Sequence, residues 1–295
     1  MTTVQPPTSD PEAVAAVQEG LLAWYAREQR RLPWRDTTDP YAVLVSEVML
    51  QQTQVTRVVP AYRRFLQLFP DPRALAAAPT GQVLQAWRGL GYNRRALALQ
   101  LAARTVVDRH GGVFPVTLHE LKALPGVGEY TARAVLAFAF GRDEAPVDTN
   151  VRRVLLRALA GRDLAPAALQ RLADIAVPAG QGRYWSAAVM DLGSAHCTAR
   201  SPACSTCPLA AACAWRRHGG DDPAAPRARR PTPFVGSARF HRGRLLDALR
   251  SGPVPTHQLA SAAHAADAVA ARRTAESLVA DGLARWRGTT LTLPD

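Results

Sequence analysis

Apolar residues recur at helical spacing along most of this chain, and the alternation typical of strands is scarce before residue 282. Val14, Val17 and Leu21, for example, share one face of a helix predicted over residues 11–31 and ended at Pro33. The same spacing, punctuated by Pro and Gly, predicts helices over 40–53, 56–69, 72–78, 81–88, 93–110, 117–124, 129–141, 149–160, 166–176 and 183–194. The pattern therefore predicts a mainly α fold.

Residues 238–295 have a different character. The spacing predicts three short helices, over 241–250, 255–264 and 267–281, and Gly282 is placed to end the last one. The strings LARW and TTLTL follow around a tight Arg287-Gly288 turn, which predicts a hairpin. We therefore expect a small winged-helix-like α+β module here, joined to the rest by a Gly-, Pro- and Arg-rich linker over 218–237.

Composition limits the classes of function. The 295 residues are 47% hydrophobic, enough for two domains, but no apolar stretch reaches the roughly 20 residues of a membrane helix. The net charge of +12 indicates a polyanionic partner such as nucleic acid, although general Arg enrichment is the alternative. The N-terminus lacks a basic segment followed by an apolar run, so no secretory signal is visible. We expect a cytoplasmic, nucleoid-associated protein.

All four cysteines, Cys197, Cys204, Cys207 and Cys213, lie in one short segment with the spacing C-x6-C-x2-C-x5-C. Thiolates are soft ligands that favour iron–sulfur clusters, zinc or Cu(I). Zinc ribbons usually present two close C-x2-C pairs, and this segment has one, so an iron–sulfur cluster is the favoured interpretation. A zinc site and a disulfide pair are the alternatives.

The string LPGVGEYTARAV places Gly126, Val127 and Gly128 between two predicted helices. Glycine permits left-handed backbone and close approach, and the free N–H groups at the start of the second helix favour a phosphate. An ordinary tight turn between helices is the alternative. The full string, however, is the helix–hairpin–helix pattern of DNA-binding proteins.

Two acidic residues lie in contrasting surroundings, as do carboxyl groups that divide the roles of acid and anion in one reaction. Glu47 lies in the apolar run VLVSEVML, where burial favours the protonated form. Asp148 precedes TNVRRVLL at a predicted helix start, where the helix dipole favours the anion. Pairing of Glu47 with an Arg, and simple helix capping by Asp148, are the alternatives.

Taken together, the helix–hairpin–helix string, VDTNVRRVLLR and the cysteine spacing resemble the endonuclease III superfamily of DNA glycosylases. LPWR, SEVMLQQTQV and GLGY narrow the resemblance to the adenine DNA glycosylase (MutY-like) branch, over roughly residues 20–217. The resemblance implies a [4Fe–4S] cluster and two mostly helical lobes. We expect a cluster lobe from 1–33 and 143–217, and a six-helix barrel lobe with the helix–hairpin–helix from 34–142.

The resemblance also implies roles for individual residues. Glu47 would protonate adenine N7, and Asp148 would stabilise the oxocarbenium ion or form a transient adduct with it. Tyr130 and Asn150 would line the catalytic pocket. Tyr130 stands where bifunctional members carry the lysine that forms a Schiff base, and the only lysine here is Lys122, so we expect no efficient strand cleavage. The remaining expected DNA-binding residues are Trp34, Arg35, Gln51, Gln52, Thr53, Leu90, Gly91, Tyr92, Gly126, Val127 and Gly128, with Gln52 and Tyr92 as the wedges that enter the base stack.

The expected function is that of a monomeric, monofunctional adenine DNA glycosylase acting on A:8-oxoguanine or A:G mispairs in double-stranded DNA. Many members of this branch read 8-oxoguanine with a C-terminal domain resembling NUDIX hydrolases, for which residues 238–295 are too short. Two alternatives stay open. One is a thymine or uracil mismatch glycosylase on the same scaffold, whose known members lack the glutamate matching Glu47. The other is a non-catalytic iron–sulfur DNA-binding regulator.

Overall fold

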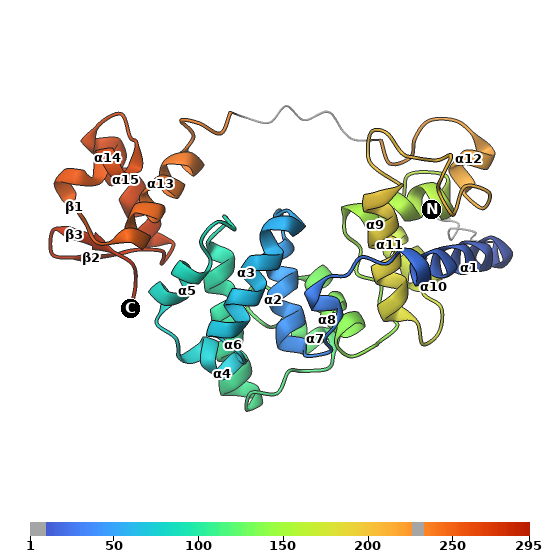
Figure 1. Cartoon of the computed structure of the whole chain (residues 1–295), viewed down its shortest axis with the longest axis horizontal. Helices are drawn as coiled ribbons and strands as arrows, with labels where there is room; N and C mark the ends of the chain where they lie inside the picture. The colour runs from blue at the N-terminus through green and yellow to red at the C-terminus, as the bar shows by residue number, and fades with distance from the viewer. Residues whose placement is uncertain (1–9, 226–232) are drawn as a thin grey trace, which may run out of the picture. The chain divides into compact units, whose positions relative to one another are not determined.

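The structure is a computed structural model that describes residues 10–225 and 233–295 (Figure 1). Internal contacts divide the chain into two units. Unit 1 comprises the described residues of Met1–Val43, Val116–Lys122 and Gly128–Ala228. Unit 2 comprises Leu44–Pro115, Ala123–Val127 and the described residues of Arg229–Asp295. None of the described helices is both long and apolar enough to span a bilayer.

Unit 1 is helical. Its elements are α1 (Pro11–Glu28), a 3-10 turn (Pro33–Arg35), α7 (Leu118–Lys122), α8 (Glu129–Phe138), α9 (Thr149–Leu155), a π turn (Leu156–Ala160), α10 (Pro166–Ala176), α11 (Gly182–Ala195) and α12 (Ala214–His218). Asp10 caps α1, because its side chain accepts a hydrogen bond from the Glu12 N–H at 3.0 Å. The sequence pattern carried this helix to residue 31, but the backbone becomes extended at Gln29.

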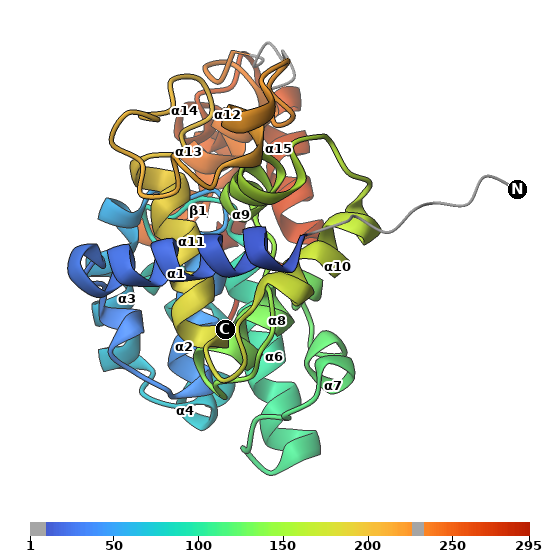
Figure 2. The same ribbon diagram turned by 90° about the vertical axis from the view of Figure 1, so that its right-hand side faces the viewer.

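The core of unit 1 forms where α1, α9 and α11 pack together. Leu21, Leu155 and Trp185 are at most 2% exposed and belong to one apolar cluster. Figure 2 shows α1 crossing α11, and Gly193 on α11 allows this helix to pack closely against α9. A Cβ at position 193 would lie 2.7 Å from the Cβ of Asn150, so only glycine fits there.

Unit 2 holds the larger part of α2 (Pro40–Leu50), which begins in unit 1, followed by α3 (Val55–Leu68), α4 (Pro72–Ala77), α5 (Thr80–Ala86) and α6 (Arg94–His110). Phe65, Phe69 and Trp87 form a buried aromatic cluster with edge-on contacts at ring-centroid distances of 4.8 and 5.8 Å. Helix α6 ends at Gly111, whose φ of 62° is left-handed.

The C-terminal module contains α13 (Ala238–Ser251), β1 (Val254–Pro255), a 3-10 turn (Thr256–Gln258), α14 (Leu259–Ala263), α15 (Ala268–Ala280), β2 (Arg285–Arg287) and β3 (Thr290–Thr292). The strands form an antiparallel sheet in the order β1-β3-β2. The predicted helices and hairpin are present, with two differences. The helix expected over 255–264 is shortened by β1 and the 3-10 turn, and the hairpin turn is Gly288-Thr289, because Arg287 already pairs with Thr290.

This module packs on α5 and α6 within unit 2. The backbone N–H groups of Thr80 and Gly81 donate to the carbonyls of Asp295 and Pro294, each at 2.9 Å. Arg250 donates to the Leu84 carbonyl at 3.0 Å. The chain end therefore satisfies the first free N–H groups of α5, whose own cap residue is a proline and makes no side-chain hydrogen bond there.

Candidate active site and cluster loop

Asp148 occupies the N-cap of α9, in unit 1. Its Oδ1 accepts a hydrogen bond from the Val151 N–H at 2.7 Å, and its Oδ2 accepts one from the Asn150 side-chain amide at 3.1 Å. Both carboxylate oxygens thus have a hydrogen-bond donor, at the positive end of the helix dipole. Capping of the helix and stabilisation of a cation are compatible, because a carboxylate oxygen keeps a further lone pair.

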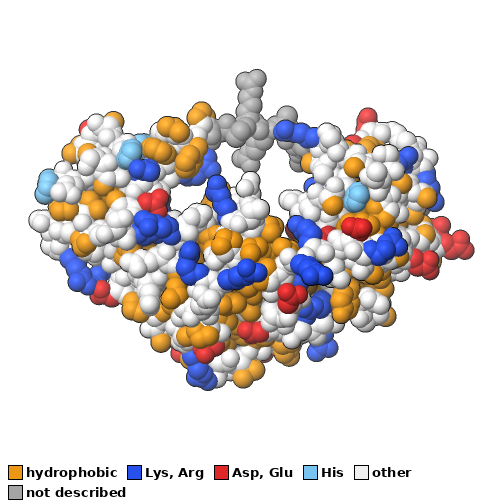
Figure 3. Space-filling view, viewed as in Figure 1, with side chains coloured by type: hydrophobic (Ala, Val, Ile, Leu, Met, Phe, Trp, Pro, Cys, Tyr) orange, Lys and Arg blue, Asp and Glu red, His pale blue; other side chains and the backbone are white. Residues whose placement is uncertain are grey.

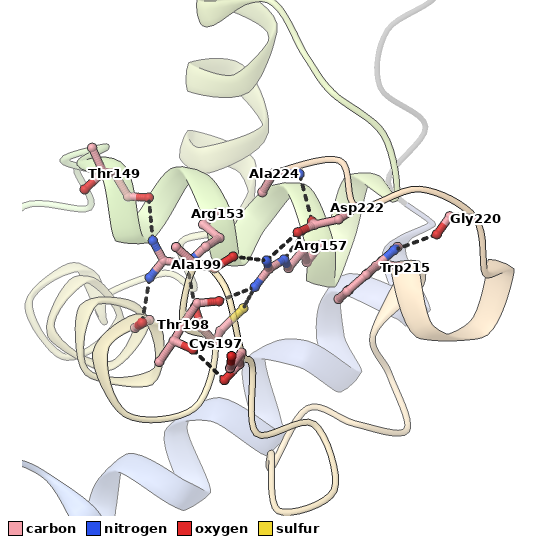
Figure 4. Close-up of polar contacts among 12 residues, drawn as sticks. Thr149, Arg153, Arg157, Cys197, Thr198, Ala199, Trp215, Gly220, Asp222 and Ala224 are labelled. Atoms are coloured by element: carbon pink, nitrogen blue, oxygen red, sulfur yellow. Dashed lines mark hydrogen bonds and ion pairs between the residues drawn. The ribbon is translucent and has the colours of Figure 1, made fainter. Parts of the chain in front are cut away.

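A chain of hydrogen bonds runs from Asp148 to the first cysteine. Asn150 accepts from the Arg153 Nη2 at 2.7 Å, and Arg153 donates through Nε to the Cys197 carbonyl at 2.5 Å (Figure 4). Arg153 also donates to the Gly193 carbonyl at 2.6 Å. Burial lowers the pKa of Arg153, and the neighbouring Cys197 acts in the opposite direction. Asp148 is therefore linked to Cys197 through Asn150 and Arg153.

The cysteine loop follows α11 and closes at α12. All four cysteines are free thiols and partly buried. Burial raises the pKa of the Cys207 and Cys213 thiols, and the charges of other cysteines act in the same direction. Cys213 caps the start of α12, and its thiol donates to the Arg157 carbonyl at 3.3 Å.

Arg157, in the π turn Leu156–Ala160, is a buried cation that contacts the cysteine loop. It is 1% exposed, and its Nη1 donates to the Cys197 sulfur at 3.4 Å. Asp222 accepts two hydrogen bonds from Arg157, at 2.8 and 2.5 Å, and the guanidinium lies over the Trp215 ring with its Cζ 5.0 Å from the ring centroid (Figure 4). Burial opposes the charge, but hydrogen bonds to Asp222 and Cys197 hold the pKa of Arg157 above its usual value.

The donor set of the loop fits an iron–sulfur cluster. Four unpaired thiols lie in one loop, and a buried guanidinium donates to one of their sulfur atoms, as an anionic group would require. In the parts of the chain that the structure describes, no three His, Cys, Asp or Glu side chains are grouped to hold a single metal ion. A cluster binds one thiolate at each of several iron atoms, so it does not require its ligands to meet at one point.

The helix–hairpin–helix string adopts the predicted turn. Gly126, in unit 2, has a left-handed φ of 75°, and a Cβ there would lie 2.6 Å from the Cβ of Ala98. The Val127 N–H donates to the Leu124 carbonyl at 3.1 Å. Gly128, in unit 1, is the N-cap of α8, and nothing lies within 4 Å of where its Cβ would be. An open N-terminus of a ten-residue helix can accept a phosphate.

Tyr130 lies in the first turn of α8, beside the ion pairs of Glu129. Lys122, the only lysine, donates to Glu129, which also accepts from Arg133 at 2.8 Å. The hydrogen bonds from Lys122 and Arg133 lower the pKa of Glu129. The only lysine side chain of the protein is therefore held in a surface ion pair that joins the end of α7 to the start of α8.

Trp34 and Arg35 lie in the 3-10 turn of unit 1, and Trp34 is buried. The Arg35 guanidinium binds both oxygens of Asp191, at 2.5 and 2.8 Å, and Arg30 shares the same carboxylate. Burial alone would raise the pKa of Asp191, but the hydrogen bonds and charges of Arg35 and Arg30 outweigh it and lower that pKa. Arg35 therefore forms a buried ion pair with Asp191, whatever contact it makes with a base.

Glu47 lies in unit 2, in the C-terminal half of α2, and is 5% exposed. Its helix neighbours Leu44, Val48 and Met49 are also buried. The predicted wedge residues are in the same unit. Gln52 and Tyr92 both have left-handed backbones, with φ of 56° and 45°, and Tyr92 is 50% exposed.

The two wedge loops contact each other. The Thr53 hydroxyl donates to the Leu90 carbonyl at 3.3 Å, so this hydrogen bond joins residues 51–53 to residues 90–92. The Leu90 side chain is buried, and its backbone carbonyl accepts the hydrogen bond from the other loop. Sequence reasoning missed the arginines of the site, Arg153 and Arg157, and Asp222, the partner of Arg157. Arginine is so frequent in this chain that no pattern separates these from surface residues.

A helix–hairpin–helix turn, a helix-capping aspartate joined to a four-cysteine loop, and a buried glutamate in a second helical unit define an iron–sulfur, DNA-binding class of base-processing proteins. Comparison with known families agrees. Residues 45–196 match the model of the HhH-GPD superfamily base excision DNA repair proteins, and residues 197–213 match the iron–sulfur binding domain of endonuclease III. The chain belongs to the HhH-GPD superfamily of base excision DNA repair proteins, and its cysteine loop is an iron–sulfur binding domain.

The chain is similar to an adenine DNA glycosylase of Mycobacterium tuberculosis, 44% identical over 270 residues that cover 89% of this chain and 88% of that protein. An adenine DNA glycosylase of Mycolicibacterium smegmatis is 42% identical over 268 residues, covering 89% and 90%. Since 89% of this chain is matched, the similarity must include part of residues 238–295. A solved structure of a thermostable thymine-DNA glycosylase superimposes with a TM-score of 0.64 at 28% identity, covering 70% of this chain and 98% of that one.

Proposed function

We propose that this protein is a monofunctional adenine DNA glycosylase, active as a monomer with a [4Fe–4S] cluster, that removes adenine mispaired with 8-oxoguanine or guanine. The observation that carries the proposal is the burial of Glu47 in α2, in a protein similar to adenine DNA glycosylases over nearly its whole length. This glutamate is the residue that the resemblance assigns to adenine and that thymine-specific members lack.

The chemistry follows from two carboxyl groups in different surroundings. A buried carboxyl retains its proton more readily than one in water, and Glu47 would deliver that proton to N7 of the extruded adenine. The Asp148 carboxylate, with hydrogen-bond donors at both oxygens, would stabilise the cation left on the sugar. Tyr130 and Asn150 would complete the pocket, with Asn150 fixing the orientation of the Asp148 carboxylate.

Hydrolysis without strand cleavage follows from the lack of a suitable amine. A Schiff base needs an unprotonated amine that reaches the sugar, and the only lysine is ion-paired with Glu129. The hydroxyl of Tyr130 cannot replace it. We therefore propose that water completes the reaction and leaves an abasic site.

Cys197, Cys204, Cys207 and Cys213 would hold the cluster, with Arg157 balancing its charge. The cluster would supply a rigid cross-link of the loop and take no part in bond cleavage. Gly126 to Gly128 and the wedge loops would bind duplex DNA, assisted by Lys and Arg side chains that are dispersed over the face of the molecule seen in Figure 3. We propose that residues 1–33 and 143–217 form the cluster lobe, that residues 34–142 form the six-helix barrel lobe, and that residues 238–295 form a winged-helix-like module. We also propose that the protein acts in the cytoplasm, on the nucleoid.

The experiment that tests the proposal uses duplexes with adenine, thymine or uracil opposite guanine or 8-oxoguanine. After incubation, each sample is divided and half is treated with alkali. The proposal predicts cleavage at adenine only, and only after alkali. Cleavage at thymine or uracil would instead support a pyrimidine mismatch glycosylase, and tight binding without an abasic product would support a non-catalytic regulator. Strand breaks before alkali would contradict the monofunctional assignment.

A further inference from the structure

Arg95, in the first turn of α6, is the most heavily bonded side chain near the wedge loops. Its Nη1 donates to the carbonyls of Val48 and Gln51, both at 2.6 Å, and to that of Met49 at 3.0 Å. These three carbonyls are at the C-terminus of α2 and in the turn that follows it, the turn that leads into Gln52. One guanidinium nitrogen thus satisfies carbonyls that the end of α2 leaves without helical partners.

The other side of the same guanidinium holds the second loop. Nη2 donates to the Leu90 and Gly91 carbonyls at 3.0 and 3.1 Å, and to the Thr53 hydroxyl at 3.1 Å. The Arg95 Cζ lies 5.5 Å from the ring centroid of Trp87 and 5.7 Å from that of Tyr92. Arg95 therefore bonds to both wedge loops at once.

Both loops need such support, because Gln52 and Tyr92 have left-handed backbone angles, which are unfavourable for residues with a side chain. Strained conformations persist only when surrounding contacts fix them. Burial lowers the pKa of Arg95 to about 10, so the guanidinium is charged at neutral pH. Its bonds to the carbonyls are therefore charge-assisted. A lysine could not replace it, because an ammonium is a single point with three donors.

We propose that Arg95 is a positioning residue that locks the 51–53 and 90–92 loops into one rigid wedge, so that both enter the base stack together when a nucleotide is extruded. This inference rests on the proposed function, since it assumes that the protein extrudes a base. In this inference Arg95 fixes the conformation of residues 51–53 and 90–92 and does not bind a DNA phosphate. Its loss would leave the protein able to bind ordinary duplex DNA but unable to retain the distorted form.

The test compares wild type with Arg95→Gln and Arg95→Lys. Gln100→Ala is the control for stability, because Gln100 is also on α6, is 2% exposed and donates to the Leu75 and Ala78 carbonyls, away from both loops. Each protein is titrated with a paired duplex and with the same duplex carrying an abasic-site analogue opposite guanine, at several salt concentrations. Fluorescence of 2-aminopurine at the target position reports unstacking independently of bond cleavage.

The inference predicts that the ratio of affinities for the abasic and the paired duplex falls at least about tenfold in both Arg95 variants. Most of the 2-aminopurine fluorescence increase should also be lost. The dependence of affinity on salt concentration should be unchanged. Gln100→Ala should lower the melting temperature and keep the preference. An equal loss on both duplexes with a salt slope smaller by about one would make Arg95 a phosphate contact and overturn the inference. So would Arg95 variants that keep the preference. A wild type that prefers the abasic duplex but releases no adenine would count against the proposed function alone.

Discussion

The ion pair between Arg157 and Asp222 yields a prediction about the cysteine loop. Asp222→Asn removes the counter-charge of a guanidinium whose side chain is 2% exposed, while the Asp222 side chain is 21% exposed. Charge-assisted hydrogen bonds contribute about 1.5–3 kcal/mol each, and breaking a fully buried pair costs about 3–5 kcal/mol. Because Asp222 is partly solvated and asparagine keeps one acceptor, we expect a loss of about 2 kcal/mol, or roughly 30-fold in the population of the opened loop.

The assay is the loss of the visible absorbance of the cluster in excess iron chelator. If the loop must open before iron leaves, the rate of loss scales with the opened population and should rise about 30-fold. Asp163→Asn is the matched control, because Asp163 forms a 2.5 Å ion pair with Arg152 in the same unit, with side chains 54% and 38% exposed. Such a surface pair contributes about 0–1 kcal/mol. If Asp222→Asn releases iron no faster than Asp163→Asn, Arg157 does not hold the loop through Asp222.

Two further predictions concern unit 1. The pKa of Asp191 is lowered in the folded protein, so its contribution to stability is present above the unfolded pKa of about 3.9 and is lost as pH falls through the folded value. Asp191→Asn should therefore reduce the free energy of unfolding at pH 7 and flatten its decline below about pH 4, and unchanged acid unfolding curves would contradict this. Tyr130→Lys should introduce an amine in the first turn of α8 and produce strand breaks without alkali, together with a borohydride-trapped DNA adduct, and no trapped adduct would argue against its place beside the sugar.

Much of the fold was predictable because local signals dominate it. The N-cap at Asp148, the turn at Gly126 and the end of α6 at Gly111 depend on residues within a few positions of each other, so sequence spacing reveals them. The residue range of the cysteine loop was equally accessible, and the family comparison confirms the iron–sulfur assignment. The end of α1 was wrong by three residues, because Gln29 is extended where helix-forming residues continue.

Contacts between distant residues were not predictable. Asp222 lies 65 positions from Arg157, and Arg95 is 47 positions from Val48, so no periodicity links them. Each of these arginines sits on a helix among other arginines, and sequence alone cannot tell which one turns inward. The docking of Pro294 and Asp295 on the start of α5 likewise required the folded chain, because backbone carbonyls leave no signal in the sequence.

The most direct test of the central claim is single-turnover release of adenine by Glu47→Gln, measured beside its affinity for the same mispaired duplex. The substitution keeps the size of the side chain and removes the transferable proton. The account predicts loss of adenine release by at least about a hundredfold, as expected for a general acid, with DNA affinity within a few-fold of wild type. Adenine release at a rate near that of wild type would contradict the assignment of Glu47 as the acid, and with it the proposed mechanism.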